Sequence, residues 1–285
     1  MEEPVEYLAS VSKTEEQYKK NPKVLIVGFG VVGHNLKNLF PWADVYDVKF
    51  KYTTPQFMKE DGCYYYSSAP SAVYDYALIA VPTPKLDDGS ADLSFVKDAI
   101  SSVKASIYLI KSAVPPTTTD SLKKDYPGKH ICVSPEYQGA TQHALKGEDF
   151  LIVGGDREDT DKVVELWQYI FTGKLRTYQT TAVAAELCKY MENSFLATKV
   201  VFCNEFYRIA KAFGVNYSEL RELFVVADPR VNKSHTFVYK DYPFYDSKCF
   251  NKDLPAIVAA SKEKGYDAPF IQSVIDVNEG YKKGK

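Results

Sequence analysis

The 285-residue sequence has no excess of positive charge, because 35 lysines and arginines nearly balance 37 aspartates and glutamates. A protein that binds a nucleic-acid backbone normally carries a basic excess, so the formal net charge of −2 argues against a nucleic-acid partner. No apolar run approaches the roughly 18 residues of a membrane span, and the acidic N-terminus lacks a signal-peptide core. We therefore expect a soluble, cytoplasmic protein without a membrane partner.

The sequence also lacks cysteines at paired or metal-binding spacings. Its five cysteines are an odd number without a C-x-x-C motif, which argues against a disulfide framework or a zinc site, so no metal is predicted. What is present is a globular composition, with 45% hydrophobic and 25% charged residues. The length suits one large domain or two ordinary ones and is enough to bury a sizeable core.

Short β-rich runs alternate with helix-length segments from residue 23 to residue 180. In chain order the runs are KVLIVG, ADVYDV, YALIAV, IYLIKS, HICVSP, LIVGG and LRTYQ. Helices are expected between them, for example at 92–104 and 159–171. Strands that alternate with helices predict an α/β fold, here a Rossmann-type doubly wound parallel sheet with helices on both faces. The polar residues 1–22 are predicted to be an extension outside this domain.

The remainder, 181–285, is predicted to be a small all-α domain for dimerisation and substrate binding. No proline or glycine interrupts 182–213, and Thr180 or Thr181 could cap the start of this helix while Gly214 could end it. Such a helix would span roughly 48 Å, so we expect it to bridge two lobes or to form a homodimer interface. Further helices are predicted at the following ranges: 217–227, about 254–264, and 269–282.

The motif G-x-G-x-x-G follows the first β-rich run directly and begins a helix. Gly28 permits a tight turn, Gly30 lets backbone amides approach a pyrophosphate, and Gly33 allows close packing of helix on strand. The amides of Val31 and Val32 at the helix N-terminus would add donors for the phosphates. The pattern predicts a dinucleotide site, and a purely structural glycine turn is the alternative.

An acidic residue at the end of the second β-rich run favours NAD as the cofactor. Asp47 follows Gly28 at about the 20-residue spacing of the motif, where a carboxylate would accept hydrogen bonds from an adenosine ribose. It would also repel a 2′-phosphate and so disfavour NADP, although Lys49 and Lys51 lie nearby and weaken this preference. Thr83, in a V-P-T-P stretch, is predicted to lie at the carboxyl edge of the sheet, where such folds bind ligands.

Candidates for catalysis lie farther along the chain. Lys189 and Asn193 are four residues apart on the long predicted helix and so share one face, where an ammonium and an amide could hold an oxyanion. Glu136 follows the run HICVSP and could act as a base. From spacing alone, a solvated lysine, an ordinary polar position and a loop carboxylate stay open as alternatives.

Cys249 lies in the stretch K-C-F-N-K-D, with Lys252 and Asp253 close behind it. Neighbouring lysines are expected to lower the pKa of the thiol from about 8.5 and so to supply more thiolate. Asp253 could accept or orient a proton. An inert packing cysteine is the alternative to a nucleophile.

Taken together, these motifs resemble the UDP-glucose/GDP-mannose dehydrogenase family. The matching stretches are VLIVGFGVVG, VPTP, IKSAVPPTTTDSL, SPEY, AAELCKYMENSFLATKVVFCNEF and CFNKD, which extend from Lys23 to about Glu279 in the family's order. The resemblance implies oxidation of a nucleotide-sugar C6 alcohol to the carboxylate, as from UDP-glucose to UDP-glucuronate. It implies two NAD molecules per sugar and a thioester on the cysteine, with Thr83 and Lys252 near the cofactor.

The resemblance also implies a role for each catalytic candidate. Cys249 would be the nucleophile that traps the aldehyde as a thiohemiacetal, which is then oxidised to the thioester. Lys189 and Asn193 would stabilise the oxyanion. Asp253 would orient water or a lysine, and Glu136 would assist thioester hydrolysis as a base.

Several departures from the family pattern bear on these roles. K-S-T-V-P reads K-S-A-V-P here, so Ala113 lacks the threonine hydroxyl, and Ala140 stands where a second glutamate would align. The glycine-rich approach to the cysteine reads Y-D-S-K at 245–248, and Asn251 replaces a proline. The chain also stops where the family's C-terminal nucleotide-binding domain would begin, which predicts a short form.

Three functions are therefore compatible with the sequence. We favour a compact NAD-dependent nucleotide-sugar 6-dehydrogenase that forms a homodimer through the 182–213 helix. Related two-lobe enzymes also carry a K-x-x-x-N pair on the interdomain helix, so a two-electron NAD-dependent dehydrogenase of a small hydroxy acid is the second. The third is a catalytically inactive NAD-binding or regulatory homologue.

Overall fold

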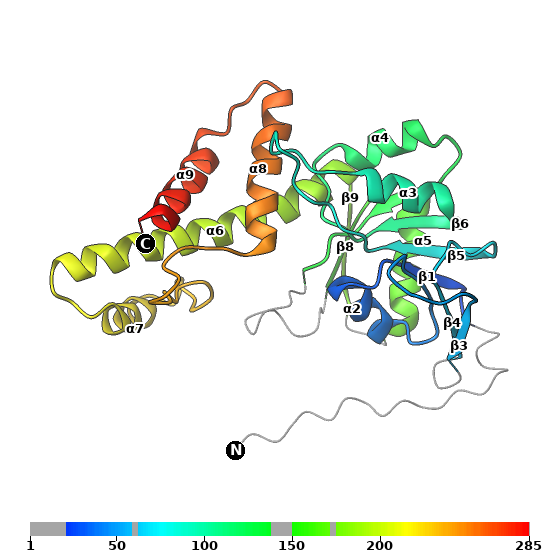
Figure 1. Cartoon of the computed structure of the whole chain (residues 1–285), viewed down its shortest axis with the longest axis horizontal. Helices are drawn as coiled ribbons and strands as arrows, with labels where there is room; N and C mark the ends of the chain where they lie inside the picture. Colours follow the sequence, from blue (N-terminus) through cyan, green and yellow to red (C-terminus); the bar gives the residue numbers. More distant parts are fainter. Residues whose placement is uncertain (1–20, 59–61, 138–149, 172–174, 285) are drawn as a thin grey trace, which may run out of the picture.

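The protein, seen here in a computed structural model, is described for residues 21–58, 62–137, 150–171 and 175–284. Figure 1 shows a sheet domain on the right and a helical lobe on the left, and one long helix, α6, extends from the sheet into the lobe. Among the described residues, no helix is both long enough and apolar enough to cross a membrane.

The sheet of the described part has nine strands in the order β3-β4-β2-β1-β5-β6-β7-β8-β9. In chain order they are β1 Val24–Val27, β2 Asp44–Tyr46, β3 Gln56–Met58, β4 Cys63–Tyr66, β5 Val73–Ile79, β6 Lys104–Ile110, β7 Ile131–Val133, β8 Phe150–Gly154 and β9 Arg176–Thr180. The predicted α/β class and the seven expected strands are confirmed. The sheet is mixed rather than wholly parallel, because β3 pairs antiparallel with β4, and β7 pairs antiparallel with β8.

The tyrosine-rich run CYYYSS forms β4, a strand that the sequence analysis did not predict. Cys63 at its start is buried, whereas Tyr64 is exposed, so this strand is covered on one face only. Aromatic residues suit such a half-buried pleated surface. The hairpin of β3 and β4 therefore extends the sheet at the edge next to β2.

Helices cover both faces of the sheet, as predicted. They are α2 Val31–Leu39, α3 Ser94–Ser102, α4 Thr118–Asp125 and α5 Arg157–Ile170. The alternating residues of β1 show how the faces divide: Leu25 and Val27 pack with residues of α3, α4 and the start of α6, whereas Val24 and Ile26 pack with residues of α2 and α5. Because successive strand residues point to opposite faces, one buried strand supports two cores.

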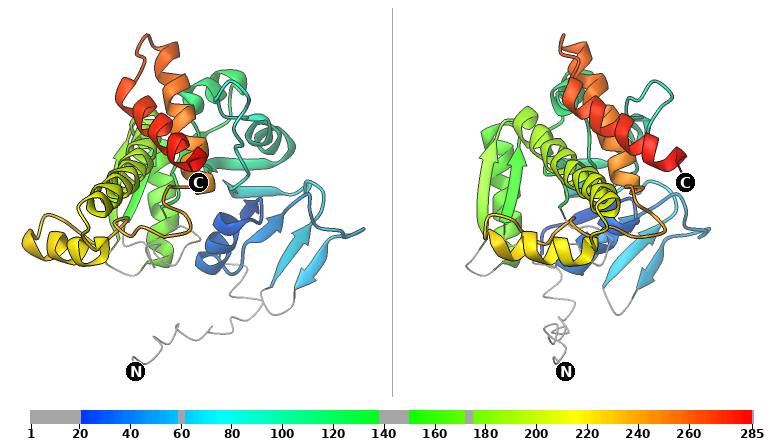
Figure 2. Two further views of the ribbon diagram at one scale, coloured as in Figure 1. Left: turned by 60° about the vertical axis from the view of Figure 1, so that its left-hand side comes forward. Right: turned by 90° about the vertical axis from the view of Figure 1, so that its left-hand side faces the viewer.

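In the described residues after β9, the named secondary-structure elements are all helices. They are α6 Ala182–Ala212, α7 Tyr217–Ala227, α8 Lys248–Glu263 and α9 Pro269–Lys283. The Thr181 hydroxyl accepts a hydrogen bond from the Ala184 amide, and Gly214 adopts a φ of +70°, so both predicted ends of α6 are confirmed. Figure 2 shows α8 and α9 stacked on one side of α6.

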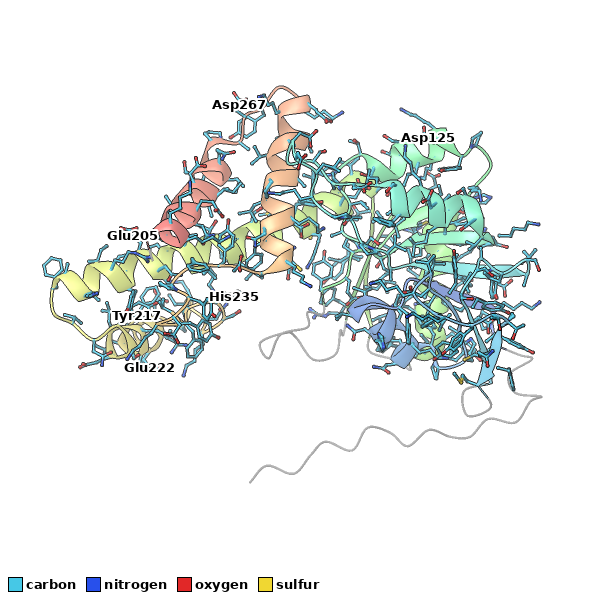
Figure 3. The ribbon with its side chains drawn as sticks, in the orientation of Figure 1. Asp125, Glu205, Tyr217, Glu222, His235 and Asp267 are labelled. Atoms are coloured by element: carbon cyan, nitrogen blue, oxygen red, sulfur yellow. The ribbon has the colours of Figure 1, made fainter. Side chains whose placement is uncertain are left out.

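The segment between α7 and α8 lies along α6 together with α7. Figure 3 places Tyr217, Glu222 and His235 close together on this side. The Tyr217 hydroxyl donates to the Thr236 carbonyl at 2.9 Å, which ties the segment to α7. The path of the chain therefore returns along α6 before it enters α8.

α8 begins at Lys248, six residues before the predicted start at about 254. Pro255 therefore lies inside the helix. The Ser247 hydroxyl accepts from the Phe250 amide, and the Asn251 amide donates to the Ser247 carbonyl at 3.0 Å. A proline at 251 could not make this second bond. The departure at Asn251 thus allows a first helical turn that contains Cys249.

Candidate active site

The glycine turn between β1 and α2 has the geometry that each glycine was predicted to provide. Gly28 has a φ of +94°, and a Cβ there would lie 2.6 Å from the Ala80 carbonyl oxygen. A Cβ on Gly33 would lie 2.1 Å from the Gly28 carbonyl oxygen, which only glycine avoids. A Cβ on Gly30 would meet nothing within 4 Å. The turn therefore leaves open space beside Gly30, where a pyrophosphate could approach the backbone.

The end of α2 nearest to this open space offers backbone donors. Gly30 is the N-cap residue, and no side chain caps the helix. The amides of Val31, Val32 and Gly33 belong to the first turn, whose N–H groups have no acceptor within their own helix. Half of the Val31 surface is exposed. The first turn of α2 thus fits an anionic phosphate.

Asp47 directly follows β2 and lies against the glycine turn. Its carboxylate accepts a hydrogen bond from the Phe29 amide at 2.6 Å and another from the Lys49 amide at 2.7 Å. The carboxylate is therefore fixed beside the backbone that would hold a dinucleotide, as the predicted ribose contact requires. The residues present fit NAD, with the pyrophosphate at Gly30 and a ribose at Asp47.

A charged cluster forms where α8 packs on α6. Asp253 of α8 is 1% exposed, and its carboxylate accepts a hydrogen bond from the Asn193 side-chain amide at 2.6 Å. The other carboxylate oxygen lies 2.6 Å from the Lys252 ammonium. A buried charge is tolerated when it is paired and hydrogen-bonded. Asp253 therefore connects two predicted site residues that are about sixty positions apart in the sequence.

Lys252 extends this cluster to the sheet domain. Its ammonium donates to the Thr83 hydroxyl at 3.0 Å and to the Ala113 carbonyl at 3.4 Å. The Thr83 hydroxyl itself donates to the same carbonyl at 2.9 Å. Thr83 and Ala113 follow β5 and β6, at the carboxyl edge where open α/β sheets bind ligands. The structure thus brings the 252–253 pair to the predicted ligand edge, and Ala113 contributes through its backbone.

Lys189 lies one turn before Asn193 on α6, as predicted. Its ammonium forms an ion pair with Glu192 at 2.6 Å and lies 4.7 Å from the centre of the Tyr137 ring. The Asn193 amide is engaged by Asp253. Both predicted oxyanion donors therefore have protein partners that a substrate oxygen would have to share or displace.

Cys249 is exposed and lies in the first turn of α8. Although the residue is exposed, the protein surrounds its thiol enough for burial to raise the pKa above its ordinary value, and the charge of Asp253 raises it further. Lys252 and Lys189 lower it, but by less. The predicted lowering of this pKa is therefore wrong in its net direction, chiefly because the sequence did not show how far the protein surrounds the thiol. The electrostatic contact with Lys189 brings these two predicted residues together.

Glu136 follows β7, and its side chain is largely buried. Its carboxylate forms an ion pair with Lys111 at 3.4 Å, and the Lys111 ammonium also contacts the Ser134 hydroxyl at 3.5 Å. Lys111 directly follows β6, and its side chain is 2% exposed. The pair fixes Glu136 at the carboxyl edge of the sheet, on the strand next to the one that leads to Ala113.

Sequence reasoning gave no role to Lys111, Glu192 or Glu186, although all three were inside quoted motifs. Lys111 ends the apolar run IYLIK, and a lysine that continues a buried strand signals a buried charge. Glu192 is three residues after Lys189, a spacing at which helical side chains meet. Glu186 is three residues before Lys189, on a helix face that the sequence alone could not identify as buried.

The rewritten approach to the cysteine is packed rather than open. Tyr245 is buried against Phe250, and its backbone exchanges two hydrogen bonds with the Asn278 side chain of α9. Ser247 caps α8. The residues that replace glycines thus hold the start of α8 against α9, whereas Ala140 lies outside the described residues.

Two hollows among the described residues lie away from this cluster. One of about 560 Å³ is lined by Asn21, Asp75 and Lys162 among others, and one of about 460 Å³ lies beside Arg208 and Tyr281. Neither includes a predicted site residue. In the described part of the chain, no group of three or more His, Cys, Asp or Glu side chains could hold a metal ion. The candidate site is therefore defined by its side-chain contacts.

Two family models match the chain. Residues 64–171 match the NAD-binding domain of the UDP-glucose/GDP-mannose dehydrogenase family, and residues 183–280 match its central domain. A solved UDP-glucose dehydrogenase from Pyrobaculum islandicum has the same fold, with a TM-score of 0.73 and 21% identity, covering 96% of this chain and 70% of that one.

Curated relatives agree with these matches. The UDP-glucose 6-dehydrogenase AglM of Haloferax volcanii is 30% identical over 232 residues, which are 72% of this chain and 52% of the relative. The UDP-N-acetyl-D-mannosamine dehydrogenase of Methanocaldococcus jannaschii is 31% identical over 273 residues, which are 89% of this chain and 61% of the relative. The chain thus spans between half and two thirds of the length of these relatives. It belongs to the UDP-glucose/GDP-mannose dehydrogenase family.

Proposed function

We propose that this chain oxidises the C6 alcohol of a nucleotide sugar to the carboxylate with two NAD molecules, through a thioester on Cys249. UDP-glucose is the first substrate to test, because one relative is named for it. The observation that carries the proposal is the position of α8. Its first turns bring Cys249, Lys252 and Asp253 to α6 and to the carboxyl edge of the sheet.

NAD, when bound at the glycine turn, would accept a hydride in each of the two oxidation steps. Gly30 and the first turn of α2 would hold its pyrophosphate, and Asp47 would hold a ribose. Thr83 and Lys252 lie at the same edge of the sheet. This chain would therefore bind the cofactor mainly with backbone groups and one carboxylate.

Cys249 would add to the aldehyde that the first oxidation produces. The thiol supplies both the sulfur that bonds to the carbonyl carbon and the proton that the new hydroxyl carries, so the raised pKa of the resting thiol is compatible with this step. The second oxidation removes a hydride from the thiohemiacetal carbon and a proton from its hydroxyl. Water then displaces the sulfur and releases the carboxylate and the free thiol.

The neighbouring side chains suit these steps. The Lys189 ammonium and the Asn193 amide could stabilise negative charge on the reacting oxygen, and one such donor typically contributes on the order of 10²–10³ in rate. Asp253 positions both Asn193 and Lys252. Glu136, fixed by Lys111, could activate the water that hydrolyses the thioester.

The test is the number of NADH molecules formed per UDP-glucose consumed, with a mass-spectrometric search for an acyl group on Cys249. We expect two NADH per sugar in the wild type and no UDP-glucuronate from Cys249→Ala. Cys188→Ala is the matched control, because Cys188 is also exposed.

The other two functions are outcomes of the same experiment. If Cys249→Ala still forms one NADH per turnover and a small hydroxy acid is the better substrate, the protein is a two-electron dehydrogenase and the thioester route is excluded. NAD binding by calorimetry, without turnover of any nucleotide sugar, would instead indicate a non-catalytic homologue.

We also propose that the protein forms a homodimer through α6. The exposed apolar residues of this helix lie within an arc of about 100° at 100° per residue, opposite the face that carries Lys189 and Asn193. They are Leu187, Met191, Phe195, Phe202, Phe206, Ile209 and Phe213. A second copy could cover this face without blocking the candidate active site.

Sedimentation analysis tests the dimer. Phe195→Asp should convert the protein to a monomer, whereas Phe57→Asp, an exposed phenylalanine on β3, should leave the mass unchanged. A wild-type monomer at micromolar concentration would contradict this interface.

A further inference from the structure

One short loop, residues 112–117, is held by both helices that carry the proposed catalytic residues. It connects β6 to α4 at the carboxyl edge of the sheet. At its first end, the Ala113 carbonyl accepts hydrogen bonds from Thr83 and from Lys252 of α8. At its other end, Thr117 donates its amide to Glu186 of α6. The loop therefore lies between the sheet domain and both α6 and α8.

Glu186 makes an unusual set of contacts for a carboxylate that is 1% exposed. One oxygen accepts the Thr117 amide at 2.7 Å, and the other accepts the Thr119 amide at 2.8 Å and the Thr119 hydroxyl at 2.7 Å. These donors form the start of α4, which has no side-chain cap of its own. Glu186 thus takes the place of an N-cap residue from a different helix.

The backbone of Thr117, which is hydrogen-bonded to Glu186, has an unfavourable conformation. Its φ is +78°, in the left-handed region that residues other than glycine rarely adopt. Such strain persists only where surrounding contacts fix it. The bonds of Glu186 to Thr117 and Thr119 supply such a constraint and so set the direction in which the loop returns toward Ala113.

We propose that Glu186 is a positioning residue that fixes the loop 112–117 to α6 and thereby aligns Lys189 and Asn193 with the Thr83–Lys252 contact. The inference rests on the proposed function for its catalytic consequence. Glu186, Lys189 and Asn193 lie on one face of a single helix, so a shift of the loop contact moves both donors together. Glu186 touches no reacting group and acts only through the loop.

The surroundings of Glu186 also make this contact sensitive to pH. Asp120 of α4 is the charged side chain that interacts with it, and Tyr190 follows it on α6. The negative charge of Asp253 on α8 raises the pKa of the Tyr190 hydroxyl. The strands β7 and β8 carry no charged residue. Burial, with a smaller contribution from Asp120, raises the pKa of Glu186 to about 7, although its three hydrogen bonds lower it. Release of the loop from a folded α6 would break only the three hydrogen bonds, which favour the ionised carboxylate, so ionisation strengthens this local contact. Global unfolding differs, because it returns the carboxyl to water and so removes the burial that raises its pKa.

The first measurement is amide hydrogen exchange in the full chain between pH 6 and pH 8.5, corrected for intrinsic rates. In the wild type, protection of the segment 112–122 should rise as pH passes 7. In Glu186→Gln, which keeps the size but loses the charge, protection should fall at least tenfold and no longer change with pH. Asp159→Asn is the matched control, because Asp159 is another buried carboxylate, and it contacts His130 rather than the loop.

The second measurement is the pH profile of UDP-glucose oxidation at a temperature at which all variants are folded. We expect Glu186→Gln to lose at least tenfold in kcat, with less than a threefold change in the KM for NAD. The change of kcat with pH near 7 should also be absent from this variant. Thr119→Val, which removes one of the three hydrogen bonds, should have an intermediate effect. Asp159→Asn should retain the wild-type profile.

These outcomes separate positioning from a merely structural role. If Glu186→Gln lowers the melting temperature but keeps the wild-type kcat and pH profile, the positioning role is excluded. Unchanged exchange of 112–122 in Glu186→Gln would overturn the loop contact itself. If no variant and not even the wild type oxidises a nucleotide sugar, the proposed function fails, and the exchange experiment still decides whether Glu186 holds the loop.

Discussion

The glycine turn at β1–α2 and the charged cluster at α6–α8 are two different kinds of site. The turn consists of backbone groups within a few residues of one another, and its requirements are steric, as at Gly28 and Gly33. The cluster consists of side chains from α6, α8 and two strand ends, and its requirements are electrostatic. The turn is therefore sensitive to atoms added at Gly28 and Gly33, whereas the cluster is sensitive to the loss of a charged partner.

The largest expected effect comes from removing the central carboxylate of the cluster. Asp253→Ala leaves Lys252 and Asn193 without their buried partner, and loss of one member of such a pair costs about 3–5 kcal/mol. Urea unfolding should show this loss. Asp267→Ala, an exposed aspartate between α8 and α9, should change the free energy of unfolding by less than about 0.5 kcal/mol. Equal stabilities for the two variants would contradict the electrostatic account of the cluster.

The next effect is a pH dependence that belongs to Glu186. Because burial raises its folded pKa from 4.5 to about 7, the protonated form is favoured in the folded state. Its stabilising contribution is full below pH 4.5 and is lost as pH rises through 7. The free energy of unfolding of the wild type, relative to Glu186→Gln, should fall by about 2–3 kcal/mol between pH 5 and pH 8. A difference that stays constant over this range would show that Glu186 does not titrate there.

Substitutions in the glycine turn should separate packing from binding. Gly33→Ala forces a Cβ against the Gly28 carbonyl, and such overpacking costs about 1–3 kcal/mol. Gly30→Ala meets no neighbour, so it should unfold like the wild type but bind NAD at least tenfold more weakly, because the methyl group occupies the space for the pyrophosphate. Thermal unfolding and calorimetric titration with NAD measure the two effects. Wild-type affinity in Gly30→Ala would place the cofactor elsewhere.

The smallest effect concerns the reactivity of the Cys249 thiol. Lys189 lowers the pKa of this thiol, so Lys189→Met should raise it and slow alkylation by iodoacetamide at pH 8 a fewfold. The measurement uses a Cys188→Ser background, because Cys188 is also exposed. Lys199→Met on the same helix should leave the rate unchanged, since Lys199 bonds Asn232 instead. An equal effect of both lysines would mean that Lys189 has no specific contact with the sulfur.

The fold was largely predictable from the sequence because its signals are local. β-rich runs, the cap at Thr181 and the left-handed Gly214 each depend on a few adjacent residues. The errors have equally definite causes. The strand β4 was missed because only one of its faces is buried in the fold. The start of α8 was placed too late because it depends on the Ser247 cap and the Asn251 amide together. Family membership, predicted from linked motifs, is confirmed.

The candidate site was predictable in its members but not in its interactions. The sequence placed Lys189 and Asn193 on one helix face, but it did not show that Glu192 and Asp253 already bind them. It predicted a lowered pKa for the Cys249 thiol, because the neighbouring lysines are visible in the sequence, whereas the burial that raises this pKa depends on the fold. The assigned catalytic roles stay predictions.

By itself, the sequence determined the strand and helix order, the glycine turn and the family, since each follows from the conformational preferences of neighbouring residues. Only the tertiary structure decided that one loop is held at Ala113 by α8 and at Thr117 by α6, and that Glu186 is buried where it caps α4. The reason is physical. Backbone preference acts over a few residues, whereas burial and charge pairing depend on which distant segments come together when the chain folds.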